Sequence, residues 1–369
     1  MKISLLPLAG LLPVFLVVSA HGQAAGVPVL STPGTATWLS EITSSGTRTV
    51  FTITGDTVLD WGQFNLGSGS ELVFDFIGGN SVVNMLNGTS TQTISGTVSS
   101  NGNVGFFSPN APLRVTGTVT AENVTLATMN VDQQAFAGGD TFTMTAGSGS
   151  ALTVTGSVTA TRGNVVLAGQ TVRVGGSGEI TATDAIRIGG GSRITVGKSG
   201  LGRRLKADNG DGFVLHMGRS RAPRIEVAAG REINVGGRLD TGSSSRRIFL
   251  EVGQDGKILR EGTGVMVGRT AINGTYLKNG VRVGPDDVVR SAVNSSTVKL
   301  PVVKRPGGTT VSTSRTLVND VPMSASMDSA RDSKRESARV ASRADAKKPM
   351  LARASFFGMR GGSGGEAKR

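Results

Sequence analysis

The chain has 369 residues, with no cysteine, 54 glycines and a formal net charge of +13. The lack of thiols excludes disulfide bridges and cysteine-ligated metal sites, so backbone pairing and apolar burial must stabilise the protein. The charge is uneven, because residues 21–185 hold four Lys and Arg against ten Asp and Glu, whereas residues 186–270 hold sixteen against eight.

An apolar run opens the chain. It follows Met1-Lys2, extends from Ile3 to Val18 without a charge and ends in Ser19-Ala20. A basic start, an apolar stretch and small residues at its end are typical of a secretory signal peptide, which we predict over residues 1–20. A retained membrane anchor is the alternative, although the prolines and the glycine within the run favour cleavage.

Residues 21–49 precede the first regular strand pattern, and we predict that they form an amino-terminal cap. The physical reason is that the exposed end of a strand ladder pairs with other chains unless it is covered. A second cap is predicted over Ala271–Pro285, where the strand pattern ends.

Residues 60–112 alternate apolar and small polar side chains, as in Leu72, Phe74 and Phe76. Asn-Gly pairs interrupt the alternation at Asn87-Gly88 and Asn101-Gly102. This pattern predicts strands joined by tight turns.

The same segment carries a distinctive set of residues in a fixed order: Trp61, Phe64, Asn65, Leu66, Gly67, Asn84, Gly88, Ile94, Ser95, Gly96, Asn101, Gly102, Pro109 and Asn110. In order and spacing, this set resembles the amino-terminal secretion domain of the filamentous haemagglutinin family, the large exoproteins of bacterial two-partner secretion. One turn departs from the family pattern. Where the family typically carries Asn-Pro-Asn-Gly, this chain has Ser108-Pro109-Asn110-Ala111.

The resemblance implies a secretion domain with its core over residues 50–131, and a route of export. In the family, the chain crosses the inner membrane by its signal peptide and is then bound by the periplasmic recognition domains of an outer-membrane partner transporter. It passes through that transporter unfolded and folds outside, so this protein is expected to be secreted or held at the cell surface. The residues expected to serve recognition or nucleation are Asn65, Asn84, Gly88, Asn101, Gly102, Pro109 and Asn110. The alternative interpretation is that they are corner residues, where Asn and Gly relieve backbone strain.

Internal repetition predicts the fold. Val158-Thr159-Ala160-Thr161 recurs as Ile180-Thr181-Ala182-Thr183, and Gly117–Ala121 is an earlier copy. Apolar pairs recur with them: Val124 and Leu126, then Val165 and Leu167, then Ile186 and Ile188; and Val172 and Val174, then Ile194 and Val196. A period of about 22 residues with three apolar pairs describes one coil of a β-helix. The predicted fold class is therefore all-β, a right-handed parallel β-helix with about eleven coils, of which those over residues 132–285 follow the secretion domain.

The core of such a fold is narrow. Small and β-branched side chains suit it, whereas we expect large aromatic side chains to distort it.

Residues 286–369 form a basic tail rich in Ser, Arg, Ala and Lys, which we predict to be mostly disordered. Within it, Ser329–Arg353 has the composition to become helical on a partner. One interpretation of the tail is a solvated end. The other is adsorption to an anionic polysaccharide, lipopolysaccharide or a host surface, because a dense cationic segment gains affinity by releasing counterions. No aromatic residues are interleaved with the charges, so no specific nucleic-acid partner is expected.

No enzymatic constellation is evident in the sequence. His216 lies in an apolar run, which favours a structural over a catalytic histidine. Asp208, Asp211 and Lys206 flank Asn209-Gly210, and this composition is ordinary for a turn. It is a poor match to the paired acids of a glycosidase or to a calcium loop. We therefore expect no catalytic residue, no metal and no cofactor.

The sequence predicts a secreted, non-enzymatic, monomeric β-helical exoprotein of two-partner secretion type, surface or adhesin-like in role. Two alternatives stay open. One is a β-helical carbohydrate-active enzyme, which would need an acidic cluster on one outer face. The other is an envelope matrix protein held by its basic tail.

Overall fold

The computed structural model describes residues 25–282 apart from residues 80, 139–140, 150, 198–204 and 209. The predicted signal peptide, the tail from residue 286 and its segment Ser329–Arg353 lie outside the described residues. Within the described part, no helix has both the length and the apolar character needed to span a membrane.

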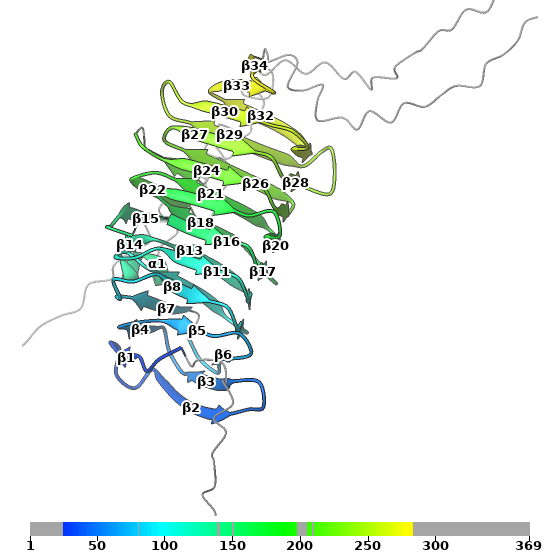
Figure 1. Ribbon diagram of the computed structural model, residues 1–369. Helices are drawn as coiled ribbons and strands as arrows, with labels where there is room; N and C mark the ends of the chain where they lie inside the picture. The colour runs from blue at the N-terminus through cyan, green and yellow to red at the C-terminus, as the bar shows by residue number, and fades with distance from the viewer. Residues whose placement is uncertain are drawn as a thin grey trace, which may run out of the picture. The chain divides into compact units, whose positions relative to one another are not determined.

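Three parallel β-sheets, which we name A, B and C, share the strands of each coil (Figure 1). The parallel strands of sheet A are β4 (Thr57–Trp61), β7 (Ser81–Leu86), β10 (Asn103–Phe107), β13 (Asn123–Ala127), β18 (Val165–Gly169), β21 (Ala185–Gly190), β26 (Arg224–Ala229), β29 (Arg247–Val252) and β32 (Arg269–Asn273). Those of sheet B are β3 (Thr47–Ile53), β6 (Glu71–Phe76), β9 (Thr97–Ser100), β12 (Thr118–Ala121), β17 (Ser157–Ala160), β20 (Glu179–Ala182), β25 (Arg219–Arg221), β28 (Arg238–Asp240) and β31 (Val265–Val267). Those of sheet C are β5 (Asn65–Leu66), β8 (Gln92–Ile94), β11 (Leu113–Val115), β16 (Ala151–Val154), β19 (Thr171–Val174), β24 (Phe213–His216), β27 (Glu232–Val235), β30 (Lys257–Arg260) and β33 (Thr275–Lys278).

Each coil takes one strand from sheet B, one from sheet A and one from sheet C, in that order along the chain. Each sheet has ten strands, of which one is antiparallel, so the described residues form nine coils. We number them 1 to 9, coil 1 being β3, β4 and β5. The predicted parallel β-helix is confirmed, with fewer coils than the eleven or so expected.

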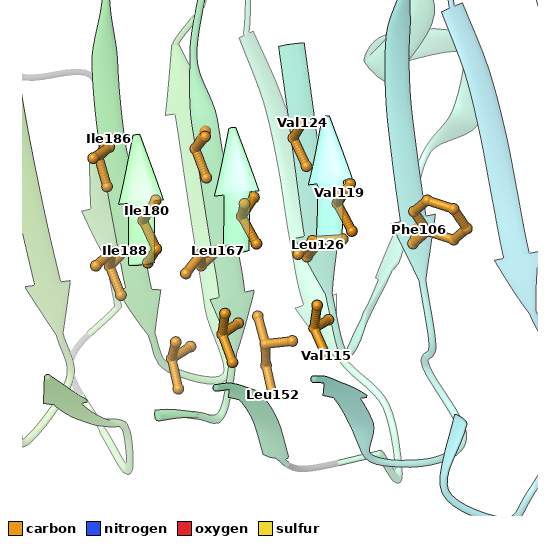
Figure 2. Close-up of a cluster of buried hydrophobic side chains, with 14 of the residues drawn as sticks. Phe106, Val115, Val119, Val124, Leu126, Leu152, Leu167, Ile180, Ile186 and Ile188 are labelled. Atoms are coloured by element: carbon orange, nitrogen blue, oxygen red, sulfur yellow. The ribbon is translucent and has the colours of Figure 1, made fainter. Parts of the chain in front are cut away.

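The core consists of inward side chains that stack in register from coil to coil. Val119 pairs with Val158, and Val158 with Ile180. In sheet A, Val165 pairs in the same way with Ile186. All of these side chains are fully buried, and Figure 2 shows several, among them Val119 and Ile180. Burying one such side chain stabilises the fold by about 1.5–3 kcal/mol, so the predicted repeat is also the energetic unit of the structure.

Aromatic side chains fill the core of the first three coils, contrary to the expectation that they would distort it. The ring centroids of Trp61 and Phe64 lie 4.9 Å apart, and those of Phe51 and Phe74 lie 5.5 Å apart. Phe106 continues the cluster, 5.6 Å from Phe64. The rings fit because they pack edge-on or tilted against one another, which aromatic pairs prefer to direct stacking.

Two excursions leave the coils between sheets A and C and explain the smaller number of coils. The first, in coil 4, comprises β14 (Met129–Val131), α1 (Gln133–Gly138) and β15 (Thr141–Ala146). The second, in coil 6, comprises β22 (Arg193–Gly197) and β23 (Leu205–Ala207). Together they form a four-stranded antiparallel sheet, sheet D, in the order β14-β15-β22-β23.

Sheet D and α1 cover the outer face of sheet A with a second apolar core. Phe136 of α1 lies between Phe107 and Phe142, with ring centroids 5.2 Å and 5.3 Å away. The other members come from both layers: Val83, Met85, Ala127, Met129, Met144, Val166, Ala168, Ile194, Val196, Leu205 and Ala228. One predicted repeat is therefore wrong, because Val172 pairs with Val214 and not with Ile194. Ile194 and Val196 alternate like coil residues because β22 also buries one of its faces.

Glycines form a column at the corner between sheets C and B. A Cβ atom on Gly117 would lie 2.0 Å from the carbonyl oxygen of Gly96, and one on Gly156 would lie 2.0 Å from that of Gly117. The same approach recurs at Gly218 and Gly237. Glycine is needed at these positions because the backbones of successive coils are in direct contact at this corner and leave no room for a Cβ atom.

The ends of the ladder are antiparallel. β1 (Val29–Leu30) pairs with β4, β2 (Ala36–Ile42) with β3, and β34 (Val281–Arg282) with β33. The prediction of a second cap from Ala271 is wrong, because Ala271 and Thr275 still pair in parallel with coil 8. The described antiparallel part at this end is β34 alone.

Candidate functional site

The seven residues expected to serve recognition or nucleation all lie in coils 1 to 3. Two lie in strands, Asn65 in β5 and Asn84 in β7. The others lie at corners: Gly88 follows β7, Asn101 and Gly102 lie between β9 and β10, and Pro109 and Asn110 lie between β10 and β11. The structure therefore brings them into neighbouring coils, but distributes them over two strands and two corners and does not gather them in one pocket.

Asn84 is an inward residue of β7, in register with Leu59 and Phe106, and is fully buried. Its Oδ1 accepts a hydrogen bond of 3.0 Å from the indole Nε1 of Trp61. Its Nδ2 donates one of 3.1 Å to the carbonyl oxygen of Gly105. Because Trp61 belongs to coil 1 and Gly105 to coil 3, one side-chain amide joins three successive coils.

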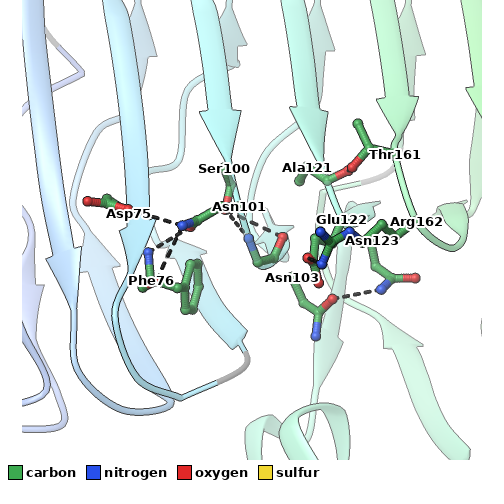
Figure 3. A network of polar contacts seen from close by, with 11 residues as sticks. Asp75, Phe76, Ser100, Asn101, Asn103, Ala121, Glu122, Asn123, Thr161 and Arg162 are labelled. Atoms are coloured by element: carbon green, nitrogen blue, oxygen red, sulfur yellow. Dashed lines mark hydrogen bonds and ion pairs between the residues drawn. The ribbon is translucent and has the colours of Figure 1, made fainter.

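Asn101 acts as an additional peptide group at the corner between sheets B and A (Figure 3). Its Oδ1 accepts a bond of 2.7 Å from the backbone N–H of Phe76. Its Nδ2 donates to the carbonyl oxygen of Phe76 at 3.3 Å and to Asp75 Oδ1 at 3.1 Å. The side chain thereby extends the pairing of coils 2 and 3 past the end of β9. Gly102 is required beside it, since a Cβ there would lie 2.6 Å from a ring carbon of Phe76.

The corner between sheets A and C holds Gly88, Pro109 and Asn110. A Cβ on Gly88 would lie 2.4 Å from the carbonyl oxygen of Gly62, so only glycine fits against coil 1. Asn110 Nδ2 donates to the carbonyl oxygen of Asn87 at 3.4 Å, and Pro109 O accepts from the N–H of Gly149 at 2.7 Å. The corner is therefore tied to the coils on both sides.

The turn that departs from the family pattern is closed by its own residues. Ser108 is fully buried, and its hydroxyl donates to the carbonyl oxygen of Ala111 at 2.8 Å. Its N–H donates to the carbonyl oxygen of Ala127 in the next coil at 2.8 Å. The side chain of Ser108 thus closes this turn, and its N–H holds the turn against the next coil.

Asn65 makes the simplest contact of the set. Its Oδ1 accepts a bond of 2.8 Å from the hydroxyl of Thr93, its register partner in coil 2. This is an ordinary cross-strand polar pair on the outer face of sheet C.

Two polar features were missed by the sequence interpretation. Gln92 is fully buried at the start of β8, where its Oε1 accepts a bond of 2.6 Å from the N–H of Phe64. Asn103, Asn123 and Asn164 form a ladder where strands β10, β13 and β18 of sheet A begin. In this ladder, Asn123 Nδ2 donates to Asn103 Oδ1 at 2.7 Å, as Figure 3 shows. Asn123 Oδ1 in turn accepts from the N–H of Asn164 at 2.7 Å. The only sequence signal was the recurrence of Asn just before an apolar pair, which the structure explains as side chains stacked between coils.

The residues weighed for catalysis or metal binding lie apart. His216 is an inward residue of β24, fully buried between Val174 and Val235 of the adjacent coils. Asp211 forms an exposed ion pair with Arg231 at 3.5 Å. Lys206 lies in β23 of sheet D, and Asn209 is outside the described residues. In the described ranges, no three His, Cys, Asp or Glu side chains are grouped so that they could hold a metal ion.

Burial gives His216 a pH-dependent effect on stability. Burial lowers the pKa of His216 from 6.5 to about 4, and its Nε2 shares a hydrogen bond of 2.7 Å with the hydroxyl of Ser220. The unfolded chain binds a proton below pH about 6.5 whereas the folded chain does not, so stability is lost as the pH falls toward about 4. Compared with a His216→Leu variant, the protein is expected to lose about 2.5 kcal/mol more of its free energy of unfolding between pH about 7.5 and about 4.5.

Denaturant titrations of both proteins at the two pH values measure this difference. The variant also loses the hydrogen bond to Ser220, but that loss affects both pH values equally and cancels in the comparison. If the free energies of unfolding of the two proteins changed with pH in the same way, burial would not lower the pKa of His216 in the folded protein.

Comparisons with known proteins give structural similarities but no match by sequence. No protein-family model matches the chain, and no curated protein matches it. Among solved structures, the fold is similar to the crystal structure of the HMW1 secretion domain from Haemophilus influenzae. The alignment covers 68% of this chain and 77% of that chain, with 17% sequence identity and a TM-score of 0.45. At these values the similarity carries no argument about function.

Proposed function

We propose that the chain is a two-partner secretion exoprotein, exported through an outer-membrane partner transporter to the cell surface or the medium. The observation that supports this proposal is the location of the residues that resemble the family motif. Asn65, Asn84, Asn101 and Asn110 each hydrogen-bond to a neighbouring coil, and all four lie in coils 1 to 3. The residues of the resemblance thus belong to one contiguous part of the fold.

This part of the fold suits an export step in which the chain emerges from one end. Within sheets A, B and C each coil pairs only with its neighbours, so coils 1 to 3 can stack one at a time as they appear. Coils 1 to 3 contain both the aromatic cluster around Phe51, Trp61 and Phe74 and the amide contacts of Asn84. They can therefore hold together before later coils arrive, and folding outside would oppose backward movement of the chain.

The proposal requires no catalytic group and no cofactor. We therefore propose a non-enzymatic protein with a surface or adhesin-like role, monomeric, and recognised in the periplasm by the partner transporter. Asn101 and Asn110 are the best candidates for contacts with the transporter, because both lie at corners and both are exposed.

Replacing Asn101 and Asn110 together by alanine is expected to lower the extracellular yield several-fold, while precursor accumulates in the periplasm. The reason is that the variant loses corner amides that either bind the transporter or hold coil 3 to coil 2. Fractionation and immunoblotting of cells that express the protein with its partner transporter measure both pools. Secretion at the level of the unchanged protein would contradict the proposal.

A matched variant separates recognition from general stability. Asn123 and Asn164 form similar contacts between coils, but lie outside the residues of the resemblance. Replacing both by alanine is expected to lower stability to a comparable extent and to leave export unchanged. Equal export defects in the two double variants would show that stability alone controls secretion.

A further inference from the structure

The described residues contain four complete Asn-Gly pairs: Asn87-Gly88, Asn101-Gly102, Asn273-Gly274 and Asn279-Gly280. In such a pair the backbone nitrogen of glycine can attack the side-chain amide of the asparagine before it, because glycine has no side chain to hinder the approach. The attack requires the chain to bend at the asparagine. It also requires that hydrogen bonds leave the amide and the nitrogen free, and the four pairs differ in these respects.

Asn101 is the most firmly held of the four asparagines. Its Oδ1 accepts from the N–H of Phe76, and its Nδ2 donates to Phe76 and to Asp75. The N–H of Gly102 donates to the hydroxyl of Ser100 at 3.0 Å. Both the amide that would be attacked and the nitrogen that would attack are therefore engaged.

Asn87 and Asn273 are held by their neighbouring coils. Asn87 Nδ2 donates to Asp60 Oδ1 at 3.2 Å, and the backbone of Gly88 lies directly against coil 1. Asn273 is the last residue of β32, and its Nδ2 donates at 3.4 Å to its register partner, Glu251. Bending the chain at either asparagine therefore disturbs the contact between two coils.

Asn279 lies in a different setting. With Gly280 it forms the two-residue loop between β33 and β34, since Lys278 pairs with Val281. Their φ values of 49° and 78° are both positive, as in a type I′ turn. The N–H of Asn279 donates to the carbonyl oxygen of Arg260 at 3.0 Å, whereas its side-chain amide has no hydrogen-bond partner among the described residues. The amide is therefore free to react.

The hairpin that carries Asn279 is also the part of the ladder that opens most easily. It has two register pairs, Lys278 with Val281 and Leu277 with Arg282, and both residues of β34 are exposed. It lies at the carboxy-terminal end of the coils (Figure 1). Local opening costs least at terminal elements with few buried contacts. Each opening lets the chain bend at Asn279 without separating two coils.

The charges around the four pairs favour the same site. The glycine nitrogen attacks after it loses its proton, and a nearby cation stabilises the resulting anion. Lys278 and Arg282 flank the loop of Asn279. Each of the other three asparagines instead donates a hydrogen bond to a carboxylate, which opposes a second negative charge.

We propose that Asn279 deamidates spontaneously, and that this change uncaps the carboxy-terminal end of the ladder. The Gly280 nitrogen forms a bond to Cγ of Asn279, the bond from Cγ to Nδ2 breaks, and Nδ2 leaves as ammonia with the proton that Gly280 has lost. Water then opens the resulting succinimide ring at one of its two carbonyl groups. One product is aspartate. The other is isoaspartate, in which the main chain runs through Cβ and Cγ.

Isoaspartate lengthens the main chain of the loop by one methylene group. A two-residue hairpin loop depends on a backbone twist that matches its strands, so the longer loop no longer fits between Lys278 and Val281. We expect β34 to detach from β33. Because β34 is the described strand on that edge, β33 is left with unpaired N–H and C=O groups, which pair readily with other chains. Deamidation would thus turn a capped end into an adhesive one as the protein ages.

The first test uses the purified full-length protein and does not depend on the proposed export route. The protein is incubated at mildly alkaline pH, and peptide mapping by mass spectrometry follows the replacement of –NH₂ by –OH at each of the four asparagines. Asn279 is expected to react at least about tenfold faster than Asn101, since its loop opens at a lower cost. Equal rates at Asn279 and Asn101 would mean that the dipeptide alone sets the rate, and would overturn the proposed site.

The second test measures uncapping by hydrogen exchange of the backbone amides that pair β33 with β34. In the isoaspartate form these amides are expected to exchange at least about tenfold faster than in the fresh protein. Two variants serve as controls. Freshly purified Asn279→Asp protein has the new charge on a normal main chain, and Asp-Gly suits the same turn, so it should exchange like the unchanged protein. Asn279→Gly protein has no amide to lose and should stay protected throughout the incubation.

Three results of the exchange measurements would contradict uncapping by this route. Unchanged exchange in the isoaspartate form would mean that the hairpin accommodates the longer loop. Fast exchange in fresh Asn279→Asp protein would assign the effect to charge and not to the length of the main chain. Loss of protection in incubated Asn279→Gly protein would place the cause outside Asn279.

Discussion

Replacing Asn84 by leucine is expected to lower the free energy of unfolding by about 4 kcal/mol. Leucine has a similar volume, so the loss comes from hydrogen bonding and not from a cavity. The change leaves the indole N–H of Trp61 and the carbonyl oxygen of Gly105 buried without their amide partner. Each buried group left in this way costs about 1–3 kcal/mol. Equilibrium unfolding in urea measures the difference.

Two comparisons isolate the cause. Asn87→Ala removes an exposed amide that donates to Asp60 at 3.2 Å, and is expected to cost under about 1 kcal/mol. Trp61→Phe combined with Asn84→Leu removes both partners of one bond, so the double variant should be more stable than the sum of the single losses predicts. If Asn84→Leu costs no more than Asn87→Ala, the amide does not tie the first three coils together.

Alanine at Gly156 is expected to cost at least about 3 kcal/mol, because the added methyl group would meet backbone and not a movable side chain. Its Cβ would lie 2.0 Å from the carbonyl oxygen of Gly117. That oxygen also accepts the 2.9 Å hydrogen bond from the N–H of Ser157, so relief of the clash requires the two coils to move apart. Thermal and urea unfolding both report the loss.

Gly176 supplies the matched control. It lies at the next turn of the same corner, and nothing lies within 4 Å of a Cβ placed there. Gly176→Ala is expected to leave stability unchanged or to raise it by about 0.5 kcal/mol, since alanine restricts the unfolded chain. Equal losses at both positions would mean that the cost comes from backbone conformation and not from the stacking of coils.

The coils could be predicted from the sequence because residues that are equivalent in the sequence repeat are also register partners in neighbouring strands. Val158 and Ile180 recur in the sequence and face each other in the structure. The excursions could not be predicted in this way. Ile194 and Val196 alternate with polar residues as coil strands do, and only pairing with β15 distinguishes them. A period-two pattern reports that one face is buried, but not which layer buries it.

The candidate site was predictable in its position and not in its contacts. The family pattern selects Asn84 and Asn101, yet the alternation of β7 does not show that Asn84 is an inward residue surrounded by apolar side chains. Its role depends on Trp61 and Gly105, which belong to different coils. The glycine column was missed for a related reason. In the sequence each glycine indicates only a separate turn. The register of the strands is needed to show that Gly117 and Gly156 lie one above the other.

Sheet D imposes an order on assembly. β15 lies between β14 and β22, but β22 follows it in the chain only after the whole of coil 5 and most of coil 6. A chain that emerges amino-terminus first therefore passes through a stage in which β15 has an open edge and Val166 and Ala168 lack part of their cover. Open edges and uncovered apolar faces are where chains stick to one another. A pause in export between residues 170 and 192 would thus hold the protein in a state in which the edge of β15 is unpaired and the outer face of sheet A is only partly covered. Pairing of β22 with β15 ends that aggregation-prone state.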